Sequence, residues 1–204
     1  FQLLQRSFQG GFTHANAYYT GDVLEDVASF DFTSSYPYVM VSEKFPMSRG
    51  VKVDITTKEE FFVYMNDYLC VFDIRFDNLM CKETHENPIS VSKCWKKSNV
   101  VENNGRVVSA DMVCMSITNI DYNTFSMFYT WDSITISNLY VYTKNYLPTE
   151  LVKCILDLYE KKTVLKDVEG AEIEYLKSKE MINSVYGMSV TNPLRDEYIF
   201  DGAE

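Results

Sequence analysis

The period of the apolar residues changes at Pro148, and this change constrains the fold more than any other feature of the sequence. Between about residues 51 and 147, apolar residues recur near every second position, as in 68–76, a pattern typical of strands. Asn104-Gly105 separates two such runs and predicts a hairpin or loop. Beyond Pro148 the period becomes 3.6, which is typical of helices. We therefore predict an α+β fold in which a strand-rich region is followed by helices.

Two helices are expected in the last quarter of the chain. Leu151, Ile155 and Leu158 share one face of a helix predicted over 149–166. The link 167–170 ends this helix, and the second helix is expected over 171–187. Two helices joined by a tight link form an antiparallel hairpin, so the link should lie at its exposed tip.

Composition indicates a folded protein without a membrane segment. The chain has 204 residues, of which 46% are hydrophobic and 15% aromatic, so disorder is disfavoured. No apolar run reaches the roughly 18–20 residues that span a bilayer. Five cysteines form no CxxC pair, and their odd number favours a reducing compartment with buried free thiols. Cys81, His85 and Cys94 could be read as zinc ligands, but their spacing favours core or loop residues.

The net charge of −10 argues against a simple nucleic-acid-binding surface, which is normally basic. Such binding then requires basic surfaces elsewhere in a larger protein, or local ones here. Lysines do gather in one region, at 161, 162, 166, 177 and 179, while much of the acid lies in 54–87 and 167–174.

The first candidate site lies around Asp31. Residues 27–32 predict a buried strand that ends at this carboxylate, which could hold a divalent metal ion. The following residues, Ser34 and Pro37 among them, predict a turn into a helix, since Ser caps well and Pro suits first helical positions. Upstream, Gly10-Gly11 would let backbone approach backbone or a ligand closely.

The second candidate site lies on the last helix. Lys179, Asn183 and Tyr186 stand at i, i+4 and i+7, so they share one face. A Lys supplies a compact charge for a phosphate, and a planar Tyr can stack under a base. Taken alone, the same residues are more often a solvated Lys, a helical Asn and a core Tyr.

Both sites carry known motifs. The run from Lys179 to Gly187 resembles the fingers motif Lys-x3-Asn-Ser-x-Tyr-Gly of family B DNA polymerases. The run from Asp31 to Pro37 resembles their first palm motif, Asp-x2-Ser-Leu-Tyr-Pro, with Ser35 in place of Leu. Upstream, 8–11 is similar to the Tyr-x-Gly-Gly segment, with Phe in place of Tyr. The order of these motifs resembles the protein-primed branch found in small phages and linear plasmids.

The resemblance implies a role for each residue in nucleotidyl transfer by a two-metal mechanism. Asp31 is expected to be catalytic and a metal ligand, with the Phe32 carbonyl as a second contact for Mg²⁺ or Mn²⁺. Tyr36 would be the steric gate that collides with a 2′-hydroxyl. The nucleotide-binding residues would further include Lys179, Asn183, Tyr186 and one of the pair Lys162 and Lys166, which the resemblance does not choose between. The implied DNA-binding residues are Phe8, Gly10, Gly11, Phe12, Ser34 and Gly187.

The resemblance also implies the details of the α+β fold, namely an antiparallel palm sheet with packed helices, a strand-rich insertion and a two-helix fingers hairpin. It implies a domain plan as well. Residues 1–94 would be part of the palm, 95–147 an insertion that resembles the terminal-protein region, and 148–190 the fingers hairpin, with 191–204 starting the next palm segment. The third motif, Tyr-x-Asp-Thr-Asp, and the exonuclease carboxylates do not occur in this sequence. We therefore expect a fragment of a larger polymerase that is inactive alone and holds no ordered catalytic metal.

The partners implied by the resemblance are template and primer DNA, dNTP and a terminal protein, in the cytoplasm of a bacterial host. The enzyme class implied is a DNA-directed DNA polymerase. A non-catalytic nucleic-acid- or protein-binding module with a polymerase-like shape is the alternative from another class. An RNA-synthesising enzyme is disfavoured, because Tyr36 would be a bulky gate.

Overall fold

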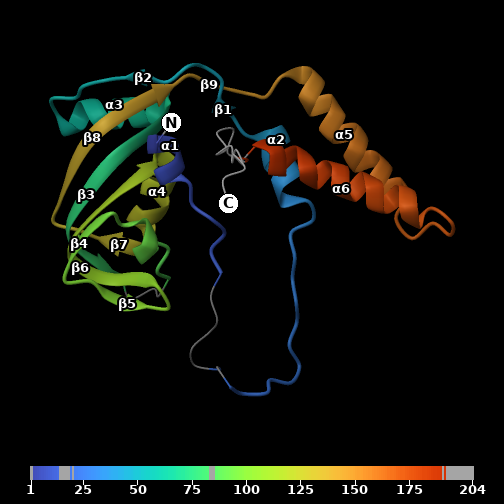
Figure 1. Cartoon of the computed structure of the whole chain (residues 1–204), viewed down its shortest axis with the longest axis horizontal. Coiled ribbons are helices and arrows are strands. Elements are labelled where there is room, and N and C mark those ends of the chain that lie inside the picture. Colours follow the sequence, from blue (N-terminus) through green and yellow to red (C-terminus); the bar gives the residue numbers. More distant parts are fainter. Residues whose placement is uncertain (1, 14–18, 20, 83–85, 190, 192–204) are drawn as a thin grey trace, which may run out of the picture. The chain divides into compact units, whose positions relative to one another are not determined.

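The computed structural model describes residues 2–13, 19, 21–82, 86–189 and 191 (Figure 1). The chain forms two compact units, each built from two segments. The sheet unit comprises residues 1–28 and 45–145. The helical unit comprises residues 29–44 and 146–204. The predicted α+β class is confirmed.

The sheet unit is built on an antiparallel sheet whose strands follow the order β2-β8-β3-β6-β4. Two short strands extend it, β5 beside β6 and β7 beside β3. The strands are β2 (Val51–Lys52), β3 (Leu69–Cys81), β4 (Lys96–Ser98), β5 (Val101–Asn103), β6 (Arg106–Thr118), β7 (Tyr129–Thr130) and β8 (Ser133–Tyr142). The strands of this one sheet therefore lie on both sides of the predicted domain boundary between residues 94 and 95. The predicted hairpin at Asn104-Gly105 joins β5 to β6, and both residues adopt the positive φ values that a tight hairpin turn requires.

A separate two-stranded ladder pairs the two ends of segment 45–145 of the sheet unit. In it β1 (Phe45–Pro46) pairs with β9 (Lys144–Asn145), so Phe45 lies opposite Asn145.

The core lies between one face of the sheet and the helices α3 (Lys58–Asp67) and α4 (Asn119–Phe128). Phe72 and Phe76 of β3 are fully buried there, and Phe61 of α3 meets Phe72 edge to face. Helix α4 begins with a capping box, in which Thr118 and Asp121 satisfy each other's backbone N–H groups.

A buried polar cluster lies on the opposite face, beneath α1 (Gln2–Ser7). Asp73 of β3 is buried and accepts hydrogen bonds from Ser116, from Asn138 and from the guanidinium of Arg6. The Arg6 side chain also donates to Ser116. Because a buried carboxylate needs partners, this cluster fastens α1 to the sheet.

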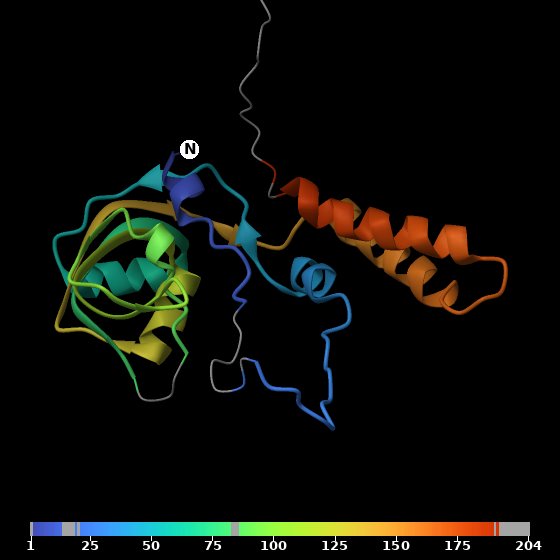
Figure 2. The same cartoon turned by 60° about the horizontal axis from the view of Figure 1, so that its bottom comes forward.

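The helical unit consists of α2 (Ser35–Ser42), α5 (Thr149–Val164) and α6 (Glu172–Ser189). Figures 1 and 2 show α5 and α6 side by side, with the connecting turn at one end. Ile155, Leu158 and Ile182 are buried in this helical unit, as are Pro37 and Met40 of α2. The antiparallel hairpin is confirmed, and its helix limits differ from the predicted ones by at most two residues. No helix in the described part of the chain is long and apolar enough to cross a membrane.

Three local predictions are wrong. Residues 27–32 form no strand, and Val27, Phe30 and Phe32 are largely exposed, because no described strand offers this segment a backbone to pair with. The Ser34 side chain caps no N–H group of α2, since its backbone is left-handed (φ 53°) rather than extended. Cys154 is exposed, whereas Cys70, Cys94 and Cys114 are buried as expected. His85 lies outside the described residues.

Candidate active site

Two aromatic rings join the predicted palm motif to the predicted fingers motif. Tyr36 on α2 and Tyr186 on α6 stack with ring centroids 4.0 Å apart and an interplanar angle of 17°. About half of Tyr36 is exposed. Burial is the main cause that raises the pKa of the Tyr186 phenol, and the neighbouring Tyr36 raises it further.

A second contact joins the predicted palm motif to α5. The ammonium group of Lys162 donates a hydrogen bond of 2.7 Å to Ser34 Oγ, and it also lies 5.7 Å from the centre of the Tyr159 ring. Lys162 is half-buried, whereas Lys166, one turn later, is exposed. The structure therefore distinguishes two lysines that the sequence left equivalent, and it places Lys162 directly beside the palm motif.

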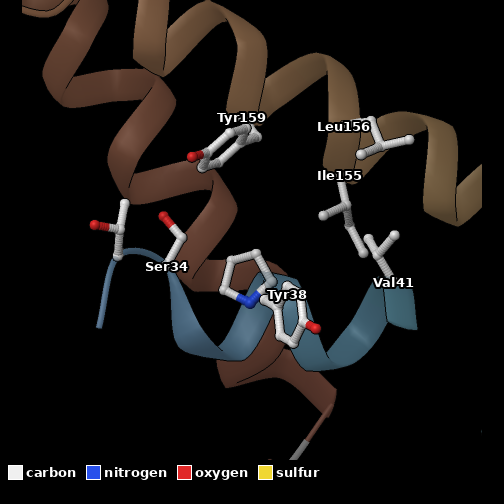
Figure 3. Close-up of a pocket in the computed structure, with 8 residues that line it drawn as sticks. Ser34, Tyr38, Val41, Ile155, Leu156 and Tyr159 are labelled. Atoms are coloured by element: carbon white, nitrogen blue, oxygen red, sulfur yellow. The ribbon is translucent and has the colours of Figure 1, made fainter. Parts of the chain in front are cut away.

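Helices α2 and α5, with Thr33 and Ser34 just before α2, line a small open pocket of about 220 Å³ beside this contact (Figure 3). Its wall is mainly apolar, with contributions from Pro37, Val41, Ile155 and Leu156. Figure 3 shows Ser34 and Tyr38 on the α2 side and Tyr159 on the α5 side. Tyr36 does not line the pocket, since its ring stacks on α6 instead.

Asp31 and Phe32 lie in an exposed segment without regular secondary structure just before α2. Within the described ranges, no group of three or more His, Cys, Asp or Glu side chains could hold a metal ion. A carboxylate and a backbone carbonyl are nonetheless the hard oxygen ligands that Mg²⁺ takes. Mg²⁺ is usually held by one or two carboxylates together with substrate phosphates, so Asp31 and Phe32 fit a partial site.

Lys179 and Asn183 project from α6 into solvent. Neither side chain forms a hydrogen bond or ion pair with another described residue. Gly187, at the end of the motif, is also exposed. The structure thus brings together Tyr36 with Tyr186 and Ser34 with Lys162, and it leaves Lys179, Asn183 and Asp31 open to solvent.

The predicted DNA-binding segment 8–12 belongs to the sheet unit. The Lys93 ammonium lies 5.7 Å from the centre of the Phe8 ring, and the Arg106 guanidinium lies 4.8 Å from that of Phe12. A Cβ added at Gly10 or Gly11 would meet no atom within 4 Å. Among the described residues, no backbone therefore approaches these glycines closely. A close approach of a ligand to Gly10 and Gly11 stays a prediction. Sequence reasoning missed both cations, although the run 93–97 (Lys-Cys-Trp-Lys-Lys) is locally basic and aromatic.

The class of protein now follows from comparison with known families. Residues 2–203 match the family described as DNA polymerase type B, organellar and viral. The chain belongs to this family. Among proteins with curated descriptions, none is significantly similar to it in sequence.

Solved structures of Phi29 DNA polymerase share the fold. The ternary complex with primer-template DNA and incoming nucleotides matches with a TM-score of 0.73 and 21% identity. That match covers 94% of this chain and 31% of the Phi29 chain. The complex with single-stranded DNA matches with a TM-score of 0.69 and 20% identity, over 94% of this chain and 30% of that one. The chain thus spans about a third of the length of these structures.

Proposed function

We propose that this chain supplies part of the nucleotidyl-transfer centre of a DNA-directed DNA polymerase. The parent enzyme would add dNTP to a primer hydroxyl under the direction of a template. One observation carries the proposal: the ring of the predicted sugar gate, Tyr36, stacks on Tyr186 of the predicted nucleotide pocket. Two motifs far apart in the sequence thus meet in one unit through the residues whose roles require them to be neighbours.

Tyr36 would select the sugar, because a ring beneath a deoxyribose collides with an added 2′-hydroxyl. Tyr186 and Asn183 would line the same pocket from α6. In the structure the two rings cover each other's faces, so an incoming nucleotide has to part them. The exposure of about half of Tyr36 supports this role, since the ring can be reached from solvent.

Lys162 and Lys179 would bind the triphosphate. Lys162 is the better candidate of the first pair, because its hydrogen bond to Ser34 already holds its charge beside the palm motif. Lys179 is exposed on α6, where a compact ammonium can approach a phosphate without breaking any described contact. Lys166, which is exposed to solvent, would contribute less to binding the triphosphate.

Asp31 and the Phe32 carbonyl would hold one of the divalent ions, Mg²⁺ or Mn²⁺. When bound, such an ion neutralises charge on the phosphates during transfer. The role of this chain's own residues is to fix that charge next to the sugar gate, since Asp31 precedes α2 directly and Tyr36 lies at the start of that helix.

The remaining roles concern DNA and protein partners. Phe8, Gly10, Gly11 and Phe12 would contact DNA, with Ser34 and Gly187 near the primer terminus. The insertion at 95–147 would dock a terminal protein, and the hairpin at 148–190 would act as fingers between palm segments. The protein-primed mechanism and a bacterial host cytoplasm belong to the same proposal.

The test is primer extension with two proteins. The chain alone should incorporate no nucleotide, because a single palm carboxylate makes a poor Mg²⁺ site. The parent protein should extend primers, and Asp31→Asn in the parent should reduce the rate about 100-fold or more while DNA binding is retained. Steady extension by the chain alone would contradict the expected need for a further carboxylate motif. An active Asp31→Asn parent would favour the non-catalytic binding module.

A further inference from the structure

We propose that Tyr159 is a positioning residue, which holds Lys162 together with Ser34 so that the lysine presents its charge to the triphosphate of an incoming nucleotide. The inference rests on the proposed function, because that function makes the triphosphate the ligand of Lys162. It deepens that function, since Tyr159 lies in neither of the two polymerase motifs, 31–37 and 179–187, and the resemblance gives it no role.

Two neutral groups hold the ammonium group of Lys162. Ser34 Oγ accepts its hydrogen bond at 2.7 Å, and the centre of the Tyr159 ring lies 5.7 Å away. Tyr159 precedes Lys162 by three residues on α5, so one rigid helix carries both partners of this cation–π contact. A ring face and a hydroxyl orient a cation without cancelling its charge, whereas a carboxylate would cancel it.

No carboxylate competes for this charge in the described part of the chain, where Lys162 forms no ion pair. Residues three and four positions apart are neighbours on a helix surface. For Lys162 these neighbours are Leu158, Tyr159, Leu165 and Lys166. None of them is acidic, so the charge of Lys162 is left for a ligand.

The other lysines of the hairpin differ in this respect. Lys153, Lys161 and Lys177 each have an acidic residue three or four positions away on the same helix. These acidic neighbours are Glu150, Asp157, Glu174 and Glu180. Among the lysines of α5 and α6, only Lys162 and Lys179 lack such a neighbour, and these are the two lysines proposed to bind the triphosphate.

The position of Ser34 is fixed by its backbone. Its left-handed conformation (φ 53°) is uncommon for a residue other than glycine, and its carbonyl accepts a hydrogen bond from the Tyr38 N–H. Such backbone conformations gather at functional sites. Ser34 and Tyr159 both line the pocket between α2 and α5, so Lys162 contacts one residue from each side of it (Figure 3).

The gain from this arrangement is preorganisation. A free lysine side chain loses rotamer freedom when it binds a ligand, and the ring and the hydroxyl remove part of that freedom beforehand. A triphosphate oxygen would replace Ser34 Oγ as the acceptor, while the Tyr159 ring stays in contact with the cation. Loss of the ring should therefore weaken nucleotide binding and leave the chemical step and DNA binding unchanged.

The geometry is tested in the 204-residue chain by NMR with ¹³C-labelled lysine. Protons over an aromatic ring resonate upfield, so the ε-methylene signal of Lys162, assigned with Lys162→Arg, should lie upfield of those of the other lysines. The upfield shift should persist in Tyr159→Phe and vanish in Tyr159→Leu. An unshifted signal in the wild-type chain, or a shift that survives in Tyr159→Leu, would overturn the proposal.

The function is tested by steady-state primer extension with the parent polymerase. Tyr159→Leu should raise KM for dNTP about two- to fivefold, as expected for one partly exposed cation–π contact, while kcat and the Kd for primer-template change less than about twofold. Tyr159→Phe keeps a ring and should keep the wild-type KM. Leu156→Ala is the matched control, since it removes another side chain of the same pocket and helix, and it should leave KM unchanged.

A double variant shows whether Tyr159 acts through Lys162. Tyr159→Leu combined with Lys162→Gln should have the KM of Lys162→Gln alone, because the ring then has no cation to position. Effects that multiply in the double variant would overturn the proposal, as would a Tyr159→Phe enzyme that is as impaired as Tyr159→Leu. Circular dichroism confirms that each variant is folded.

Failure of this inference is distinguishable from failure of the proposed function. If Lys162→Gln raises KM and Tyr159→Leu leaves it at the wild-type value, only the positioning role is wrong. If the NMR shift of Lys162 behaves as expected and the Asp31→Asn parent still extends primers, the contact exists and the proposed function is wrong.

Discussion

Tyr36 and Tyr186 stack with their ring centroids 4.0 Å apart, although 149 residues lie between them in the sequence. A stacked aromatic pair is worth about 0.5–1.5 kcal/mol beyond its area burial, and solvent exposure places this pair toward the lower end. The stack adds to the packing of α2 and α6, in which Pro37, Met40 and Ile182 are buried. It is small compared with what a bound nucleotide offers, so the two rings can serve as a separable contact rather than as core.

Removal of the Tyr36 ring should relax sugar selection in the parent polymerase. In Tyr36→Val the collision with a 2′-hydroxyl is lost, so the preference for dNTP over NTP should fall at least about tenfold. The ratio of kcat/KM for the two substrates measures it. Tyr38→Val is the matched control on the same helix, since Tyr38 lines the pocket beside α5 and not the stack. An unchanged ratio in Tyr36→Val would remove the assignment of Tyr36 as the gate.

Lys162 and Lys166 should differ in their effect on nucleotide use. Lys162→Gln removes the charge beside Ser34, so KM for dNTP in the parent should rise about tenfold, as expected for one charge-assisted contact. Lys166→Gln should change KM less than threefold, because its side chain is solvated. Steady-state kinetics at constant salt measures both. Equal effects of the two substitutions would argue that the hydrogen bond to Ser34 has no functional meaning.

The Asp73 cluster should stabilise the sheet unit. Asp73→Ala leaves the donors of Ser116, Asn138 and Arg6 without their acceptor, at about 2 kcal/mol of unfolding free energy after allowing for the exposure of Arg6. Both tryptophans, Trp95 and Trp131, lie in this unit, so urea unfolding followed by tryptophan fluorescence reports on it.

Asp77→Ala is the control for this measurement. Asp77 forms a more exposed ion pair with Arg75 on the same face of β3, and its loss should change the free energy by less than about 1 kcal/mol. A larger effect of Asp77→Ala than of Asp73→Ala would contradict the role given to the buried cluster.

The rate of reaction with a thiol reagent should distinguish the exposed Cys154 from the buried cysteines. Burial raises the pKa of Cys70 and of Cys94 to about 11, whereas Cys154 is exposed. At pH 8 a thiol reagent should therefore label Cys154 within minutes and Cys70 and Cys94 only after unfolding. Because Cys81 is half-buried, the test uses a Cys81→Ser background, in which Cys154→Ser should abolish the fast phase. A fast phase that persists in that double variant would contradict the assignment.

The same shifts predict how stability depends on pH. In the unfolded chain these thiols ionise near 9.0, and in the folded protein near 11. The unfolded state therefore loses protons first as the pH rises. Stability should be constant below about pH 9 on this account and should fall between pH 9 and 11. A double variant, Cys70→Ala with Cys94→Ala, should weaken that decline.

Sequence periodicity predicted the regular elements well. The hairpin of α5 and α6 follows from the 3.6-residue spacing of Leu151, Ile155 and Leu158, and the turn at Asn104-Gly105 follows from residues that tolerate positive φ. These signals are local, and each requires only residues close together in the chain.

The contacts between distant residues were not predictable in this way. Nothing near Tyr36 indicates Tyr186 as its partner, and nothing near Phe12 indicates Arg106. The run 27–32 has the composition of a buried strand, yet a strand also needs a neighbouring backbone, which local sequence cannot report. Ser34 was expected as a cap for its residue type, but its left-handed backbone turns the hydroxyl toward Lys162 instead.

The pairing of β1 with β9 has a consequence for how the protein can change over time. Because Phe45 lies opposite Asn145, the chain leaves and rejoins the helical unit at two neighbouring points. Residues 47–143 therefore form a long loop whose two ends are held together by the paired strands β1 and β9. Insertions or deletions within this loop need not alter the separation of its two ends, which the ladder fixes. The sheet can accordingly diverge in length and in binding partner while the helices around Tyr36 and Tyr186 keep their spacing.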